Sequence, residues 1–144
     1  MSAARAVGMV MHASCVAWNG HGLLIMGPSG SGKSGLALEL MALGCDLVSD
    51  DRTALAARDG VVLATAPESL RGKIEARGVG ILAADVARMA RLALCVDLAR
   101  VEPDRLPHEH LHNVLGVDLP CLHGVESRHF PAAVLQYLKG GRVA

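Results

Sequence analysis

An eight-residue glycine-rich segment is the clearest sign of chemistry in this chain. It fits the pattern G-x-x-x-x-G-K-[ST] without a mismatch, which predicts a loop that binds phosphate groups. Glycines let backbone N–H groups turn toward phosphate oxygens, and the helix that follows adds positive charge at its N-terminus. The lysine can reach the β- and γ-phosphates, and the last serine can bind Mg²⁺. The candidate phosphate-binding residues are Gly27, Pro28, Ser29, Gly30, Ser31, Gly32, Lys33 and Ser34.

Two adjacent carboxylates, Asp50 and Asp51, follow a short apolar strand predicted over residues 46–49. Functional residues collect at the carboxyl ends of strands in α/β sheets. We expect this strand to lie next to the strand that leads into the phosphate loop, which would put the pair beside the γ-phosphate. Phosphoryl transfer to a hydroxyl needs a carboxylate that accepts the proton, so this aspartate pair is a candidate general base. The alternative is an ordinary acidic turn after a strand.

A further acidic residue competes for the magnesium role. Asp97 ends the apolar run over residues 92–96, as a magnesium-binding aspartate does in many P-loop NTPases. If Asp97 held Mg²⁺, the chain would be a generic NTPase of that class. Leu98 and Ala99 follow it and carry no catalytic groups, so we favour the aspartate pair.

Residues 74–81 place a carboxylate, a guanidinium and two glycines within six positions. Glu75 could bind Mg²⁺, and Arg77 could stabilise charge on a phosphoryl group in transfer. Gly78 and Gly80 permit a close backbone approach. The segment therefore predicts a mobile loop at an active site.

The elements that must hold these residues form an α/β pattern. Asn19-Gly20 predicts a tight hairpin turn, because both central positions of a type I′ turn need positive φ. Asp59-Gly60 predicts a second hairpin in the same way. Apolar runs predict strands over residues 7–18, 23–26, 46–49, 53–57, 61–64, 92–98 and 115–122, and helical spacing predicts helices over residues 33–43 and 130–138.

Composition limits the function classes. The chain has 144 residues, zero formal net charge and only three aromatic residues, which argues against a nucleic-acid surface and against an anionic membrane as partner. Four widely spaced cysteines without a C-x-x-C motif indicate a reduced, cytoplasmic protein. We expect one domain over residues 1–144, without an N-terminal regulatory domain.

Histidines cluster over residues 108–112 and could bind a metal if they alternated along a strand. The segment does not fit H-E-x-x-H, which excludes the metalloprotease pattern. We expect a solvated loop there, and we expect His21, His123 and His129 on the surface.

The three motifs together resemble those of the HPr kinase/phosphorylase family, bacterial serine kinases that act on the phosphocarrier protein HPr. The family has a phosphate loop of the form G-x-S-G-x-G-K-S, an aspartate pair after a strand, and a signature close to E-I-R-G-x-G-I. The signature matches residues 75–81 and is the most specific of the three. The resemblance covers residues 9–81 and continues weakly to Arg105. It implies an α/β P-loop domain of the HPr kinase/PEP carboxykinase type, a mixed sheet with hairpins and few helices.

The resemblance also implies roles for individual residues. The proton-exchanging aspartate lies in the aspartate pair, with Asp51 favoured over Asp50, and Mg²⁺ is bound by Ser34 and Glu75. A histidine on the strand before the phosphate loop matches His12, and a later arginine in a D-R-L context matches Arg105. The catalytic residues that it implies are His12, Lys33, Asp50, Asp51, Arg77 and Arg105.

The function implied is an ATP- and Mg²⁺-dependent protein serine kinase that acts on HPr, with a reverse reaction that uses inorganic phosphate and yields pyrophosphate. Family members form homo-oligomers, and this compact chain resembles truncated forms from some proteobacteria. Gly35 stands where the family has an acidic residue, and Ala76 where it has a larger aliphatic one. The alternatives are a nucleotide- or phosphate-sensing module without catalysis, and a P-loop kinase with another acceptor.

Overall fold

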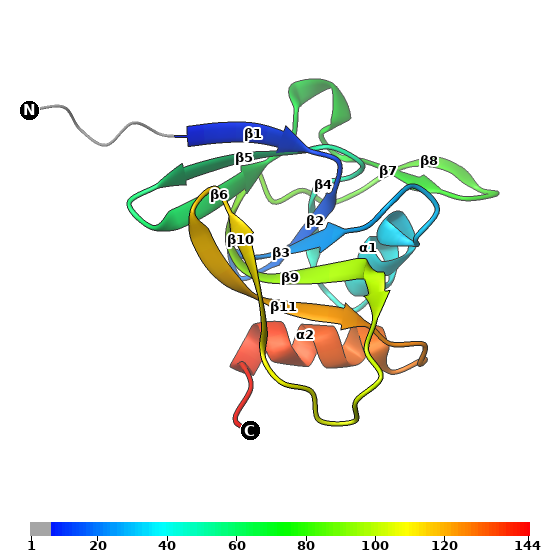
Figure 1. The fold of residues 1–144 in the computed structure, drawn as a ribbon. Coiled ribbons are helices and arrows are strands. Elements are labelled where there is room, and N and C mark those ends of the chain that lie inside the picture. Colours follow the sequence, from blue (N-terminus) through cyan, green and yellow to red (C-terminus); the bar gives the residue numbers. More distant parts are fainter. Residues whose placement is uncertain (1–6) are drawn as a thin grey trace, which may run out of the picture.

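The structure of the protein, a computed structural model, describes residues 7–144 (Figure 1). Within that range, nine strands form one large mixed sheet. These strands are β1 Val7–Met11, β2 Ser14–Trp18, β3 His21–Met26, β4 Asp46–Ser49, β5 Thr53–Arg58, β6 Val61–Thr65, β9 Met89–Val101, β10 His110–Val114 and β11 Val117–Gly124. The other elements are helix α1 Lys33–Ala42, helix α2 Phe130–Gly140, the short 3-10 helix η1 Glu68–Leu70, and a separate hairpin of β7 Lys73–Ala76 with β8 Gly80–Ala83.

The large sheet runs in the order β1-β5-β6-β9-β3-β2-β4, and β11 joins β9 with β10 on its other side. Its centre is parallel, because β3 and β11 both pair with β9 in the parallel sense. Residues 22–26 of β3 are all buried, as expected for a strand covered on both faces. The phosphate loop therefore begins at the carboxyl end of a deeply buried strand.

Two hydrophobic cores lie on the two faces of the sheet. One contains Leu36, Ala37 and Leu40 of α1 together with Val134 and Leu138 of α2. The other contains only residues from the strands and their connections within the described chain, so the sheet closes over itself on that face. Figure 1 shows both helices on the same side, with the curved outer strands opposite them.

The predicted turns are confirmed. Asn19 and Gly20 have φ values of 47° and 78°, and Asp59 and Gly60 have 53° and 76°, as type I′ turns require. Gly44 follows α1 with φ 110°, a conformation that glycine adopts without strain at the end of a helix.

The prediction of one strand over residues 7–18 is wrong. The backbone turns at His12 and Ala13, where the Ala13 N–H donates to the Met11 carbonyl at 2.9 Å. On one side of this break β1 pairs with β5, and on the other side β2 pairs with β3 and β4. The sequence is apolar on both sides of the break, so hydrophobicity alone could not locate it.

Two segments expected as loops are ordered in strands. Residues 74–81 belong to the β7–β8 hairpin, whose turn comprises residues 77–79. Residues 110–112 belong to β10, and only residues 108 and 109 lie in a loop. His123 is partly buried in β11 rather than on the surface, whereas His21 and His129 are exposed as expected.

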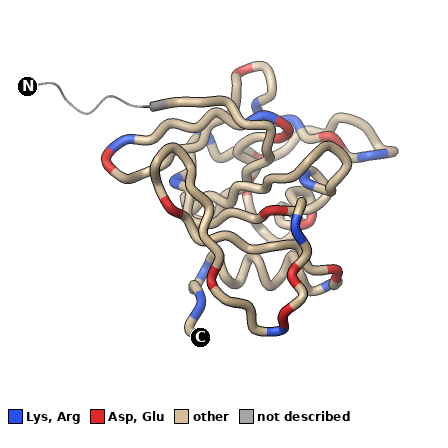
Figure 2. The backbone as a smooth tube through the Cα atoms, viewed as in Figure 1, with Lys and Arg blue, Asp and Glu red and all other residues tan. Residues whose placement is uncertain are grey.

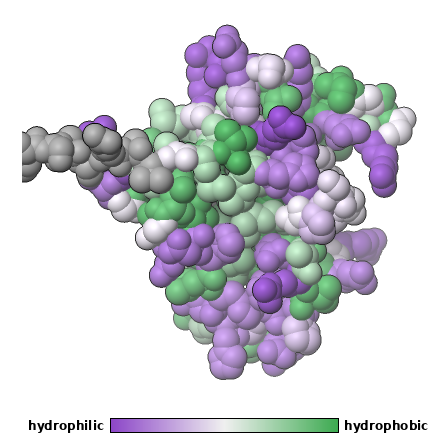
Figure 3. Space-filling view, turned by 45° about the horizontal axis from the view of Figure 1, so that its top comes forward, coloured by the Kyte–Doolittle hydropathy of each residue, from purple (hydrophilic) through white to green (hydrophobic). Residues whose placement is uncertain are grey.

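Charged residues of both signs are scattered along the backbone around the molecule, in keeping with the zero net charge (Figure 2). Figure 3 shows hydrophilic and hydrophobic residues mixed over the face that carries the outer strands. Neither helix in residues 7–144 has the length and apolar character needed to cross a bilayer.

Candidate active site

The phosphate loop, residues 27–34, connects β3 to α1 in a conformation that its glycines make possible. Gly27, Gly30 and Gly32 have φ values of 148°, 83° and 98°. A Cβ atom on Gly27 would lie 2.5 Å from the Ser31 hydroxyl oxygen, so the loop closes too tightly for a side chain there. The Ser31 N–H donates to the Pro28 carbonyl at 3.1 Å and closes the turn. The loop is thus a cradle of backbone whose positive φ angles at these three positions favour glycine.

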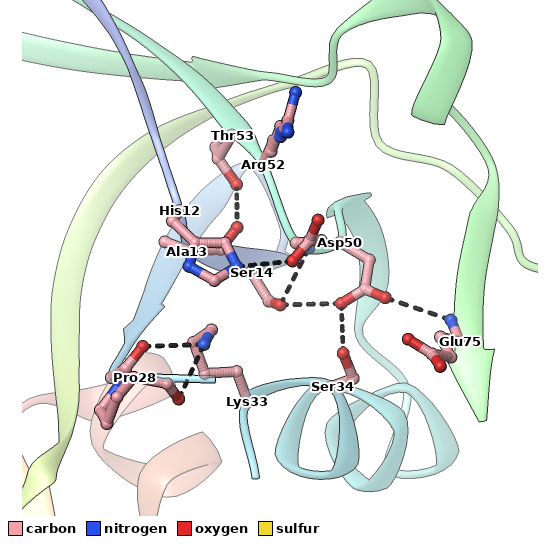
Figure 4. A network of polar contacts seen from close by, with 12 residues as sticks. His12, Ala13, Ser14, Pro28, Lys33, Ser34, Asp50, Arg52, Thr53 and Glu75 are labelled. Carbon is pink, nitrogen blue, oxygen red and sulfur yellow. Dashed lines mark hydrogen bonds and ion pairs between the residues drawn. The ribbon is translucent and has the colours of Figure 1, made fainter. Parts of the chain in front are cut away.

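Lys33 lies across this cradle. The residue is only 7% exposed, and its ammonium donates to the carbonyls of Gly27 at 2.7 Å and of Pro28 at 3.1 Å. Figure 4 shows the side chain reaching back over the loop from the start of α1. A buried ammonium held by two carbonyls supplies fixed positive charge where the cradle opens.

Asp50 is the centre of a buried hydrogen-bond network (Figure 4). The residue is 5% exposed, and its Oδ1 accepts hydrogen bonds from the hydroxyls of Ser34 at 2.7 Å and Ser14 at 2.8 Å. Its Oδ2 accepts the backbone N–H of Glu75 at 3.1 Å. One carboxylate therefore ties together α1, β2, β7 and the end of β4.

Asp51 is exposed although it is the next residue along the chain. Its φ of 69° turns the backbone sharply, and its Oδ1 lies 2.7 Å from Nε2 of His12. The two side chains are 60% and 50% exposed. They line an open cleft of about 430 Å³ together with Val10 and Arg52. The adjacent aspartates thus face different surroundings, one a closed network and the other solvent.

The aspartate pair reaches the phosphate loop by a route that differs from the prediction. β4 is not next to β3, since β2 lies between them. The contact arises because Ser34, in the first turn of α1, meets Asp50 across the end of β2. The neighbour of β3 is β9, and it carries Asp97 in register with Met26. The Asp97 carboxylate accepts the Ala99 N–H at 2.9 Å, and the described residues show it in no contact with Ser34.

The remaining candidate residues lie in different places. Glu75 is exposed on β7 beside Asp50 and Ser34, as Figure 4 shows. Arg77 is exposed in the turn of the β7–β8 hairpin. Arg105 lies on the segment between β9 and β10, which lines a second cavity beside α2. Figure 1 shows that segment below the sheet, away from the phosphate loop, so a single chain does not bring Arg105 to this site.

Two site residues are missing from the sequence prediction. Ser14 is fully buried and donates to Asp50, and Thr53 is fully buried and donates its hydroxyl to the Ala13 carbonyl at 2.8 Å. Both fix the break between β1 and β2 that presents His12. A serine two residues after His12, within an apolar run, was the available signal.

The donor set fits a nucleotide phosphate chain with Mg²⁺. The glycine cradle and the Lys33 ammonium suit phosphate oxygens, and the Ser31 hydroxyl oxygen is buried without a partner among the described residues. Hydroxyl and carboxylate oxygens from Ser34, Asp50 and Glu75 are the hard ligands that Mg²⁺ prefers.

Comparisons with known proteins bear on the family and the fold of this chain. A sequence model of the HPr serine kinase C-terminal domain matches residues 4–123. The chain is 38% identical over 102 residues to the HPr kinase/phosphorylase of Clostridium novyi (strain NT), covering 66% of this chain and 33% of that protein. The corresponding protein of Leptothrix cholodnii is 40% identical over 116 residues, covering 68% and 34%. The chain therefore spans about a third of the length of these curated relatives.

The fold also matches a solved structure, the HPr(Ser) kinase/phosphatase from Coxiella burnetii. The TM-score is 0.76 at 22% sequence identity, and the match covers 91% of this chain and 88% of that chain. The predicted α/β fold of the HPr kinase type is thereby confirmed. Because the family model spans most of its residues, the chain belongs to the HPr serine kinase C-terminal domain family.

Proposed function

We propose that this chain is an ATP- and Mg²⁺-dependent protein serine kinase domain that phosphorylates an HPr-like phosphocarrier protein. The observation that carries the proposal is the placement of the aspartate pair. Asp50 contacts Ser34 of the phosphate loop at 2.7 Å, while Asp51 faces an open cleft beside it. A phosphoryl donor and a protein hydroxyl can therefore approach the same point from two sides.

The phosphate loop binds and orients the donor. Its backbone N–H groups and the Lys33 ammonium hold the β- and γ-phosphates and stabilise the charge that develops during transfer. The chemistry that Mg²⁺ would supply here is neutralisation of part of the charge on the phosphate groups. Ser34, Asp50 and Glu75 are the residues that would hold the ion, and the buried network keeps Asp50 in place.

Asp51 accepts the proton of the acceptor serine. The serine oxygen forms a bond to the γ-phosphorus, and the bond from that phosphorus to the oxygen that bridges the β- and γ-phosphates breaks. The serine proton passes to the Asp51 carboxylate. His12 holds Asp51 by the 2.7 Å contact and so fixes the position of the base. Exposure of both side chains leaves room for a folded protein to present its serine.

The same carboxylate can serve the reverse reaction. When inorganic phosphate attacks a phosphoserine, the bond from phosphorus to the serine oxygen breaks and that oxygen takes a proton from Asp51, giving pyrophosphate. Microscopic reversibility makes one residue the base in one direction and the acid in the other. Arg77 and Arg105 would act here only through movement of their segments or through another chain of a homo-oligomer.

The test is transfer of labelled γ-phosphate from ATP to HPr by the purified chain. An HPr whose target serine is changed to Ala serves as the matched acceptor. We expect label on HPr alone, lost when Mg²⁺ is chelated. Label on both acceptors would reject the assigned serine. Label on neither, with ATP bound, would favour a sensing module or a different acceptor.

We further propose a cytoplasmic setting, where ATP and the phosphocarrier are available. The four cysteines of the chain are free and buried, as a reducing compartment allows.

A further inference from the structure

A second cluster of chemically competent side chains lies beside α2, apart from the phosphate loop. Glu102 follows β9, His110 begins β10, and His123 lies near the end of β11. One ligand atom from each of the three lies within 4.8 Å of the others. We propose that this Glu–His–His cluster, Glu102, His110 and His123, binds a divalent transition metal ion, with Zn²⁺ as the best match.

The distance between Glu102 and His110 is close to the distance between two ligands of one metal ion, which would take the place of the proton between them. Oε1 of Glu102 lies 2.7 Å from Nε2 of His110. Two ligands of a tetrahedral Zn²⁺ ion lie about 3.3 Å apart when each bond is about 2.0 Å long. The pair therefore needs to open by only about half an ångström to place Zn²⁺ between them. This hydrogen bond holds the two atoms close to the positions that a metal would require.

Glu102 is oriented by a second contact. Its Oε2 accepts the backbone N–H of Asp104 at 3.2 Å, which directs Oε1 toward His110. Hydrogen bonds of this kind fix the ligands of established metal sites. The Glu102 side chain is 7% exposed, and burial of a carboxylate calls for a compensating cation. Among the described residues no Lys or Arg forms an ion pair with it.

His123 supplies the third ligand. Its ring stacks on that of His110 with centroids 3.9 Å apart and planes 9° from parallel. Within residues 7–144 neither of its ring nitrogens has a hydrogen-bond partner. Rotation of the ring about its Cβ–Cγ bond is the adjustment that would aim one nitrogen at the shared ion. An uncommitted imidazole next to a carboxylate–imidazole pair is a ready metal ligand.

The chemistry of the donors selects the class of metal. Two imidazoles with one carboxylate suit Zn²⁺ and its neighbours, and such three-ligand sites keep a fourth position open. Mg²⁺ prefers oxygen ligands, so this site and the phosphate loop favour different ions. A cavity of about 230 Å³ adjoins the cluster, walled by Phe130, Val134 and Tyr137 of α2. The fourth position can therefore take water or a small ligand.

The test is titration of the chelator-treated full chain with Zn²⁺, in buffer with excess Mg²⁺ to occupy oxygen sites. Calorimetry should give one ion per chain, and bound Co²⁺ should show the intense visible absorption of a four-coordinate complex. Glu102→Gln and His123→Gln should each weaken Zn²⁺ binding at least tenfold. His112, also on β10 but outside the cluster, provides the matched control, because His112→Gln should leave Zn²⁺ affinity unchanged.

Several results would overturn the proposal. One is a wild-type chain that folds, as judged by circular dichroism, and yet binds no Zn²⁺. Another is weakening of Zn²⁺ binding by His112→Gln as large as that by His123→Gln. If the cluster variants fail to fold, the wild-type Co²⁺ spectrum decides the question, and an octahedral spectrum of weak absorption counts against the site. Protection of His123 from diethylpyrocarbonate by Zn²⁺ supports it independently of any variant.

Discussion

Two carboxylate–imidazole pairs in this molecule have the same kind of close contact but different surroundings. His12 with Asp51, and His110 with Glu102, each bring Nε2 to 2.7 Å from a carboxylate oxygen. The side chains are 50% and 60% exposed in the first pair, but 33% and 7% exposed in the second. Both pairs combine the same two chemical groups. The role of each pair therefore depends on the residues and the solvent around it.

The first pair opens on a cleft next to the phosphate loop, where a protein hydroxyl can enter and a proton can leave. The second pair has an imidazole stacked on it and a cavity behind it, which suits a bound ion. Exposure favours exchange of protons, and enclosure favours a fixed set of ligands. The following tests address the two regions, beginning with the largest expected effect.

Replacement of Asp51 by Asn should remove the proposed base and keep the backbone. The asparagine tolerates the positive φ of 69° at this position, so the loop should keep its shape. Loss of general base catalysis lowers rates by about 10²–10⁴-fold. The measurement is the initial rate of phosphoryl transfer to HPr at saturating ATP.

Asp59→Asn is the matched control for this variant. Asp59 is also exposed and also has positive φ, at 53°, but it lies in the turn between β5 and β6. The rate of phosphoryl transfer by Asp59→Asn should equal that of the parent chain. If Asp51→Asn kept the parental rate as well, the exposed pair would have no part in proton transfer.

Replacement of Asp50 by Ala should lower stability, in addition to removing a proposed Mg²⁺ ligand. It would leave the hydroxyls of Ser14 and Ser34 and the N–H of Glu75 without their shared acceptor. Donors left unsatisfied in a buried site cost about 1–3 kcal/mol each, reduced where water enters, so we expect a loss of about 3 kcal/mol. Urea denaturation measures the free energy of unfolding.

Asp51→Ala is the comparison for this loss of stability. Its contact with His12 is an exposed ion pair, which is worth about 0–1 kcal/mol. Equal destabilisation by the two alanine variants would contradict the division into a buried network and an exposed pair.

Local features of the site could be predicted and contacts across the sheet could not. The phosphate loop is written in eight consecutive residues, and glycine conformation with a following helix determines its shape. The aspartate pair was expected beside the γ-phosphate from a wrong strand order, because pairing of β2 with both β3 and β4 is not encoded in any short segment. Apolar alternation likewise missed the break at His12, which depends on the pairing of β1 with the distant β5.

The Glu–His–His cluster was even less predictable from the sequence. Its members come from β10, β11 and the residue after β9, and no spacing in the sequence connects them. The run of histidines over residues 108–112 was expected to be a solvated loop, yet His110 of that run belongs to the cluster. Fold type was predictable from periodicity and turns, whereas a site assembled from two strands and the residue after a third depends on the tertiary structure.

The cysteines offer a test of how closed the second region is. Burial raises the pKa of the Cys95 thiol to about 12 and that of Cys121 to about 11. At pH 8 the thiolate of Cys121 should be about 100-fold scarcer than in the unfolded chain, and iodoacetamide should react correspondingly slowly. Because the native state keeps these protons longer than the unfolded state, the free energy of unfolding should fall as the pH rises above about 9.

The unfolded chain in urea is the control, and all four thiols should then react at ordinary rates. Cys121 lines the cavity, but its Sγ is not among the clustered ligand atoms. The Co²⁺ complex should therefore lack a thiolate-to-metal charge-transfer band. Appearance of that band would show that Cys121 binds the ion, which would contradict the proposed site of two imidazoles and one carboxylate.

The smallest expected effect concerns Gly35, in the first turn of α1 beside the phosphate loop. A Cβ atom there would meet no other atom within 4 Å, and no φ constraint requires glycine. Gly35→Ala should therefore raise the free energy of unfolding by about 0.5–1 kcal/mol, since alanine loses less backbone entropy in a helix. Gly22→Ala is the control of opposite sign, because its Cβ would lie 3.0 Å from Leu92 Cδ2 and 3.1 Å from Ala90 Cβ. If Gly35→Ala destabilised the chain in thermal unfolding, the first turn of α1 would be more crowded than this structure has it.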